Sequence, residues 1–349
     1  MSGTTRAMPS RPAHRHPVAR GCRVGLLASL SLFVAGCGNQ DMLTPVSRPA
    51  REIATLWWWM LGVAGVVLGG ALVMLAIGWL RRRRPGLPLI GGNERLSWAL
   101  VIAFGILIPL AVNVAVFVTA NFVVAKATDA PLPGTTAMTI RIIGHQWWWE
   151  VRYPGGRAVT ANEIHIPVGA RVNVVATTAD VIHSFWVPQL NRKIDMIPGQ
   201  RNRVLLEADR VGRYRGQCAE FCGLQHAHMA MYVDADPPQR FRAWLRRAAA
   251  SRTPPTSALA RQGEQLFDGN ACASCHEIRG TSAQGHIGPD LTHVAGRSTL
   301  AALTIPNRPR ALLDWIRDPQ HVKPGNRMPA LGLTAAEYRA IAAYLEGLK

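Results

Sequence analysis

Charged residues are scarce in this chain of 349 residues. Asp, Glu, Lys and Arg make up only 17% of it, whereas hydrophobic residues make up 48%. That balance is typical of membrane-spanning segments joined to globular parts. Acidic residues are the scarcer kind, at 21 against 39 basic ones, so the formal net charge is +18.

Nucleic-acid-binding motifs are absent as well. A charge of +18 would by itself suggest a nucleic-acid partner. However, no helix-turn-helix, zinc-finger or RNA-binding pattern accompanies it. The charge is also clustered, with five arginines in the first 23 residues and four more at positions 81–84. The sequence therefore excludes nucleic acid as the partner.

Cysteines are few, and none of the six needs a disulfide partner. Two stand at positions 218 and 222, and two at 272 and 275. Cys37 ends a processing signal, and Cys22 lies upstream of it.

Residues 1–36 predict a secretory signal peptide of the lipoprotein type. An arginine-bearing start precedes an apolar run at 24–35 and then small residues. The ending Val34-Ala35-Gly36-Cys37 resembles a bacterial lipobox, which implies cleavage before Cys37 and acylation of its thiol. Plain signal cleavage or an uncleaved anchor is the alternative.

Two apolar runs predict a transmembrane hairpin within residues 37–125, with helices at about 54–80 and 98–125. At ~1.5 Å rise per residue, the first run gives ~40 Å of helix, enough to cross a bilayer. Trp57–Trp59 fit an interfacial belt, and the arginines at 81–84 mark the cytoplasmic side. We therefore expect a bacterial inner-membrane protein whose chain beyond residue 126 lies on the periplasmic side.

Residues 126–237 predict an all-β sandwich or barrel. Short β-type runs at 137–143, 163–166, 171–177, 203–207 and 229–233 alternate with Pro- and Gly-containing turns. A helix and linker at 238–257 then lead to a further domain at 258–349.

Residues 218–229 concentrate soft metal donors. Cys218 and Cys222 are four apart, His226 is four further on, and Met229 is three beyond that. Sulfur mixed with imidazole suits copper, zinc or iron rather than magnesium or calcium. One more ligand must come from elsewhere, and His183 is the best candidate. A structural zinc site is the alternative, although zinc has no use for a thioether.

Cys272-Ala-Ser-Cys275-His276 is the covalent attachment motif for a c-type haem, with His276 as the proximal iron ligand. Met328, in a Pro- and Gly-containing loop, is the expected sixth ligand, and such ligation raises the reduction potential. The alternative is five-coordinate iron or ligation by His286, His293 or His321. With its amphipathic helix at 333–345, this region resembles a class I cytochrome c.

The donor set at 183 and 218–229 resembles the binuclear copper centre (CuA) of cytochrome c oxidase subunit II, here of the type with a fused cytochrome c. The resemblance implies a cupredoxin-like sandwich in which Cys218 and Cys222 bridge both coppers. His183 and Met229 would complete one copper. His226 and the backbone carbonyl of Glu220 would complete the other. We call residues 126–237 the copper domain and residues 258–349 the haem domain.

The same resemblance implies further roles. Trp147 would pass electrons from a docked donor to copper, while Trp148 and Trp149 are expected to be structural. The carboxylate of Glu220 would reach Mg²⁺ shared with subunit I. His145, His165 and His228 are expected to be ordinary surface or loop residues. Glu94 lies near the family's proton-uptake glutamate, but its flanking residues do not match, so it is not assigned to the site.

The implied function is that of subunit II of a haem–copper oxidase. Electrons would pass from a cytochrome c-like donor through the chain's own haem c and copper pair to subunit I, where O2 is reduced to water with proton pumping. The basic charge disfavours docking of a basic donor at the copper domain. We expect the tethered haem to receive electrons first, since tethering raises its effective concentration. The alternatives are the small subunit of a copper-containing nitric oxide reductase and a membrane-anchored metal-binding or copper-delivery protein.

Overall fold

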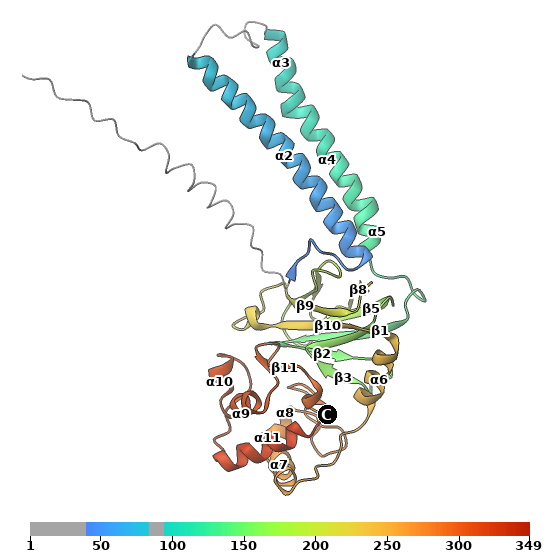
Figure 1. The fold of residues 1–349 in the computed structure, drawn as a ribbon, viewed down its shortest axis with the longest axis vertical. Coiled ribbons are helices and arrows are strands. Elements are labelled where there is room, and N and C mark those ends of the chain that lie inside the picture. The colour runs from blue at the N-terminus through green and yellow to red at the C-terminus, as the bar shows by residue number, and fades with distance from the viewer. Residues whose placement is uncertain (1–39, 84–93) are drawn as a thin grey trace, which may run out of the picture. The chain divides into compact units, whose positions relative to one another are not determined.

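The computed structural model describes residues 40–83 and 94–349, which belong to one compact unit. The expected signal peptide, Cys37 and Arg84 lie outside the described residues. Along the described chain a helical hairpin is followed by a β-sandwich and then by a helical domain (Figure 1). This order confirms the predicted fold class.

The hairpin consists of α2 (Arg48–Arg83) and a continuous helical run that packs against it. That run comprises α3 (Glu94–Ile102), the π-helical turn η2 (Ala103–Leu107), α4 (Ile108–Thr119), the π-helical turn η3 (Ala120–Val124) and α5 (Ala125–Thr128). Both helices are long and apolar enough to cross a membrane, by length and composition. They extend past the predicted apolar ranges because backbone hydrogen bonding continues into their polar flanks.

Two five-stranded sheets form the copper domain. One has the order β3-β2-β1-β5-β8 and the other β4-β10-β9-β6-β7. The strands are β1 (Met138–His145), β2 (Trp148–Arg152), β3 (Val159–Ala161), β4 (Glu163–Pro167), β5 (Val172–Thr178), β6 (His183–Trp186), β7 (Ile194–Met196), β8 (Asn202–Leu206), β9 (Gly212–Cys218) and β10 (Ala230–Asp236).

Alternating burial places one hydrophobic core between the two sheets. Along β5 the buried residues are Val172, Val174 and Ala176, the inward positions of a strand with a period of two. Trp149 of β2 is fully buried in the same core. Helix α6 (Pro238–Ala249) adds Phe241 to this core. The tight interior gives the ligand-bearing ends of the strands a rigid base.

The haem domain has its own core. Its elements are α7 (Ala258–Gly269), α8 (Ala271–Cys275), the 3-10 turn η5 (Val294–Gly296), β11 (Thr299–Leu300), β12 (Ile305–Pro306), α9 (Pro309–Arg317), α10 (Pro319–Val322) and α11 (Ala335–Glu346). Helix α11 begins with a capping box between Thr334 and Glu337 and buries Tyr344 against Phe267 of α7. The two terminal helices of the domain are thereby packed together.

The crossing of α7 and α11 depends on Gly263. A Cβ atom at this position would lie 1.9 Å from the Ala340 carbonyl oxygen and 2.9 Å from the Tyr344 Cβ. No side chain fits there without separating the helices.

We therefore expect Gly263→Ala to destabilise the haem domain by about 1–3 kcal/mol, the usual cost of overpacking. Urea unfolding of the detergent-solubilised chain, followed by circular dichroism and haem absorbance, measures the effect. Gly269→Ala is the matched control, because a Cβ at this position of the same helix meets nothing within 4 Å. Equal midpoints for the two variants would contradict the packing argument.

Candidate functional site

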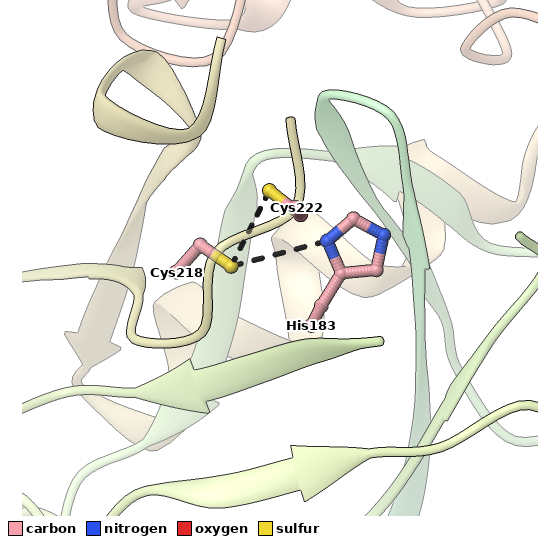
Figure 2. A group of neighbouring side chains, drawn as sticks. All are labelled: His183, Cys218 and Cys222. Carbon is pink, nitrogen blue, oxygen red and sulfur yellow. Dashed lines mark hydrogen bonds between the residues drawn. The ribbon is translucent and has the colours of Figure 1, made fainter. Parts of the chain in front are cut away.

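The soft donors predicted from the sequence lie together at one end of the sandwich. The sulfur of Cys218 lies 3.8 Å from that of Cys222 and 3.9 Å from His183 Nδ1. Figure 2 shows these three side chains pointing toward one another. The Cys222 sulfur lies 3.6 Å from His226 Nδ1 and 3.8 Å from the Met229 thioether. All five side chains therefore belong to one cluster.

Paired strands position two of these donors. His183 is the first residue of β6 and Cys218 is the last residue of β9, so both lie at strand ends. These strands are hydrogen-bonded neighbours, with Phe185 opposite Cys218. Strand ends hold a side chain more rigidly than a free loop does, because the backbone is fixed by the ladder.

The remaining donors follow β9 in a short, hydrogen-bonded segment. His226 opens the 3-10 turn η4 (His226–His228), and Met229 directly precedes β10. The Cys218 backbone N–H donates to the Met229 carbonyl oxygen at 2.9 Å, which closes the segment onto its own start. Twelve residues thereby return to the point at which they left the sheet.

The electrostatics of the cysteine pair suit a metal. Both sulfurs are buried. The hydrogen bond that they share lowers the pKa of the Cys218 thiol well below its usual range and raises the pKa of the Cys222 thiol. The lowered pKa of Cys218 favours the deprotonated sulfur that metal binding requires. The donor set of sulfur, imidazole and thioether fits copper better than zinc.

Asp180 holds the His183 ring from behind, with Oδ1 lying 2.8 Å from Nε2. Burial alone would lower the pKa of His183, but the hydrogen bond to Asp180 and the Cys218 sulfur raise it. Burial likewise opposes ionisation of Asp180, but hydrogen bonds from His183 and two backbone N–H groups lower its pKa. The carboxylate thus fixes the ring with Nδ1 directed at the sulfurs.

Gly144 also determines the position of the His183 ring. A Cβ atom at position 144 would lie 2.8 Å from His183 Cδ2. The backbone of β1 therefore forms one wall of the histidine pocket.

Glu220 presents its two oxygen-bearing groups differently. Its backbone carbonyl oxygen lies 3.1 Å from the Cys218 sulfur, inside the donor cluster. The residue as a whole is exposed. The carbonyl is thus available to a metal in the cluster, whereas the carboxylate is available to a ligand outside it.

Trp147 directly contacts residues 218–229, which we call the copper-binding segment. Its indole Nε1 donates to the Cys222 carbonyl oxygen at 3.0 Å, and Gln146 Nε2 donates to the same oxygen at 2.8 Å. Trp149 is a core residue, as expected. The indole of Trp148 stacks on His145 at a centroid separation of 4.2 Å.

An apolar cavity in the haem domain holds the other predicted ligands. Cys272, Cys275, His276 and Met328 all line it. His276 is half-buried, and desolvation lowers its pKa, which favours the neutral ring. Its Nδ1 donates to the Pro289 carbonyl oxygen at 2.8 Å, which leaves the Nε2 lone pair for a metal.

The alternative sixth ligands do not line this cavity. His286 Nδ1 lies 3.4 Å from Glu277, and His293 hydrogen-bonds the carbonyl oxygens of Lys349 and Ala250. His321 is exposed. A haem fits the thiols, imidazole and thioether on the cavity wall.

Residues of the copper domain line the same cavity, which was not predicted. They include His145, Trp147 and Trp148. The run Trp147-Trp148-Trp149 could have indicated this cavity wall, because large aromatic rings cover apolar ligands.

The prediction that His165 is an ordinary surface or loop residue is wrong. His165 lies on β4, its Nδ1 lies 2.7 Å from Asp236, and its ring stacks on Trp244.

Comparisons with known proteins agree with these two sites. A family model described as cytochrome c oxidase subunit II, periplasmic domain, matches residues 157–236, and one described as cytochrome c matches residues 260–349. Cytochrome c oxidase subunit 2 of Alkalihalophilus pseudofirmus is 35% identical over 93% of this chain and 96% of its own length. That of Bacillus subtilis is 28% identical over the same shares.

A crystal structure of the periplasmic domain of subunit II of cytochrome oxidase from Bradyrhizobium japonicum is also similar. It is 31% identical, covers 34% of this chain and 96% of its own, and has a TM-score of 0.32.

The Asp180–His183 pair gives a pH test in the metal-free chain. Asp180 has a lowered pKa, so its stabilisation is present above about pH 4 and lost as the pH falls through that pKa. His183 has a raised pKa, so its stabilisation is present below about pH 6.5 and lost as the pH rises through that pKa. Asp180→Asn should therefore lower the urea midpoint most between about pH 4 and pH 6.5.

Tryptophan fluorescence across a pH series measures this midpoint. Asp195→Asn, at an exposed position on β7, is the control and should leave the profile unchanged. A loss that is uniform over the whole pH range would rule out the pairing as its cause.

Proposed function

The chain belongs to the cytochrome c oxidase subunit 2 family, and on that premise we propose how its own residues form the electron entry of the complex. It is a membrane protein with a periplasmic domain, and it works with the other subunits of a haem–copper oxidase. Its relatives carry the name of the oxidase, so the comparisons lend no support to the nitric oxide reductase or copper-delivery alternatives.

The copper centre of the family would be held by His183, Cys218, Glu220, Cys222, His226 and Met229. The observation that carries this proposal is the clustering of two cysteine sulfurs, two imidazoles, a thioether and a carbonyl oxygen. Neighbouring donor atoms in this cluster lie 3.1–3.9 Å apart. When bound, a copper pair supplies one-electron transfer with little change in geometry. The protein's part is to hold the two sulfurs side by side in a buried pocket.

The haem would be attached covalently through Cys272 and Cys275. His276 and Met328 would supply ligands to its iron. Support comes from the shared cavity and from the hydrogen bond that directs the Nε2 lone pair of His276 away from Pro289. The buried, apolar wall would exclude water from the group and favour a high reduction potential.

Trp147 would carry electrons toward the copper residues. Its indole lines the haem cavity and donates a hydrogen bond to the Cys222 carbonyl oxygen, so one ring touches both sites. The exposed Glu220 carboxylate would contribute to a Mg²⁺ ion shared with subunit I.

We also propose where the chain lies in the cell and how its N-terminus is processed. The chain would lie in a bacterial inner membrane, with residues 37–125 as a hairpin and residues 126–237 and 258–349 on the periplasmic side, joined by 238–257. Residues 1–36 would be removed as a signal, with Cys37 acylated. The external donor would be a cytochrome c-like protein, soluble or membrane-bound, that delivers electrons to the haem domain.

The copper assignment predicts a specific spectrum. The full chain, matured in a host able to insert both groups, should hold a copper pair with the multi-line EPR pattern of an electron shared by two nuclei. Cys222→Ser should abolish that pattern, because one of the two cysteine sulfurs that would hold the copper pair is lost. Met231→Leu, at a buried methionine of β10 outside the donor set, is the control and should retain it. A zinc ion or a single copper in the unaltered chain would refute the assignment.

The haem assignment predicts that Met328→Ala lowers the reduction potential, because methionine ligation raises it. Redox titration of the haem absorbance measures the shift. His286→Ala, at an exposed histidine outside the cavity, should leave the potential unchanged. The reverse pattern would favour ligation by His286.

A further inference from the structure

The loop that carries Met328 lies against the copper domain. We call residues 323–328 the methionine loop. The Pro324 carbonyl oxygen accepts a hydrogen bond from Gln225 Nε2, in the copper-binding segment. Arg327 hydrogen-bonds Gln146 and lies 3.9 Å from Asp180. The loop expected to hold the haem iron thus also contacts residues beside the expected copper ligands.

Lys323 makes the most buried of these contacts. The residue is only 3% exposed. Its Nζ donates to the carbonyl oxygens of Trp147 at 3.0 Å, His228 at 2.9 Å and Ala301 at 3.1 Å. The first two belong to the copper domain and the third to the haem domain. One side chain therefore joins three backbone segments.

The charge state explains why a lysine suits this position. An ammonium group has three N–H donors, which match three carbonyl acceptors. A neutral amine would leave one carbonyl facing a lone pair. Burial opposes the charge and lowers the pKa of Lys323 to about 7. The three carbonyl acceptors replace the water that burial removes, and separating the domains breaks the hydrogen bonds to Trp147 and His228.

A second, independent contact lies on another edge of the interface. Glu163 Oε1, on β4, accepts from the Ser298 backbone N–H at 2.8 Å and from the Thr299 backbone N–H at 3.2 Å. Arg213 donates to the Ser298 hydroxyl at 2.7 Å. These amides report on the interface without touching Lys323.

We propose that Lys323 is a positioning residue that holds the haem domain on the copper domain, so that the haem cavity stays closed by Trp147 and Trp148. The inference rests on the proposed function only for its consequence, which is a fixed separation between the two redox sites. Arg327 is a weaker candidate for this role, because its side chain is 59% exposed and exposed ion pairs contribute little.

The test compares Lys323→Met with the unaltered full chain carrying copper and haem. Hydrogen exchange at Ser298 and Thr299 should become about tenfold faster, because the domains separate more often. Exchange within α11 should not change, because that helix lies in the haem-domain core. Electron transfer from haem to copper, measured by stopped-flow absorbance, should slow by about tenfold or more.

Controls separate docking from other roles. Lys193→Met, at an exposed lysine of the copper domain, should behave as the unaltered chain. Lys323→Gln retains two N–H donors, so exchange and electron transfer should change in the same direction but by less. This variant keeps the test valid if Lys323→Met folds poorly. Faster exchange in α11, or a change confined to the peptides bonded by Lys323, would overturn the proposal, as would an unchanged exchange rate at Ser298 and Thr299.

The spectra identify which idea has failed. Absent copper and haem signals in the unaltered chain would refute the proposed function itself. Intact signals together with unchanged exchange in Lys323→Met would refute only the role of Lys323.

Discussion

The antiparallel pairing of β6 with β9 is the constraint on which the proposed copper site depends. It sets Phe185 opposite Cys218, and the Ala219 N–H donates to the Ser184 carbonyl oxygen. His183 and Cys218 are thus brought together from positions 35 residues apart in the chain. The return of Met229 to Cys218 through one backbone hydrogen bond then leaves Cys222 and His226 little freedom. The backbone geometry of these segments thus gathers the donors.

One carbonyl oxygen of the copper-binding segment anchors a residue that also lines the haem cavity. The Cys222 carbonyl accepts from both Trp147 and Gln146, and Trp147 also forms part of the haem cavity wall. The turn between β1 and β2 thus places the Trp147 ring against both the Cys222 carbonyl and the second cofactor's pocket. Trp149, two residues further on in β2, is fully buried and packs edge-on against Phe185 in the core.

Much of this arrangement could be predicted from local sequence signals. The spacing of Cys218, Cys222, His226 and Met229 and the Cys-x-x-Cys-His motif at 272–276 are short-range patterns, and the structure brings each set together. Five strands coincide with the predicted β-type runs, namely β1, β4, β5, β8 and β10. Strand β9 was missed because its sequence Gly212-Arg-Tyr-Arg-Gly-Gln-Cys218 contains two arginines and two glycines, and only Tyr214, Gly216 and Cys218 face inward. Lys323 could not be found from sequence, since its acceptors are backbone carbonyls that carry no residue-specific signal.

The burial of Trp147 has a consequence for the order of the redox carriers. With 8% of the residue exposed, a separate protein in solution has almost no surface of this indole to meet. The attached cytochrome c domain shares a cavity with this ring in the docked arrangement. Different soluble reductants would then compete only for the outer face of the haem domain. The order in which electrons pass through the chain's own two sites would be set by their covalent connection instead of by diffusion.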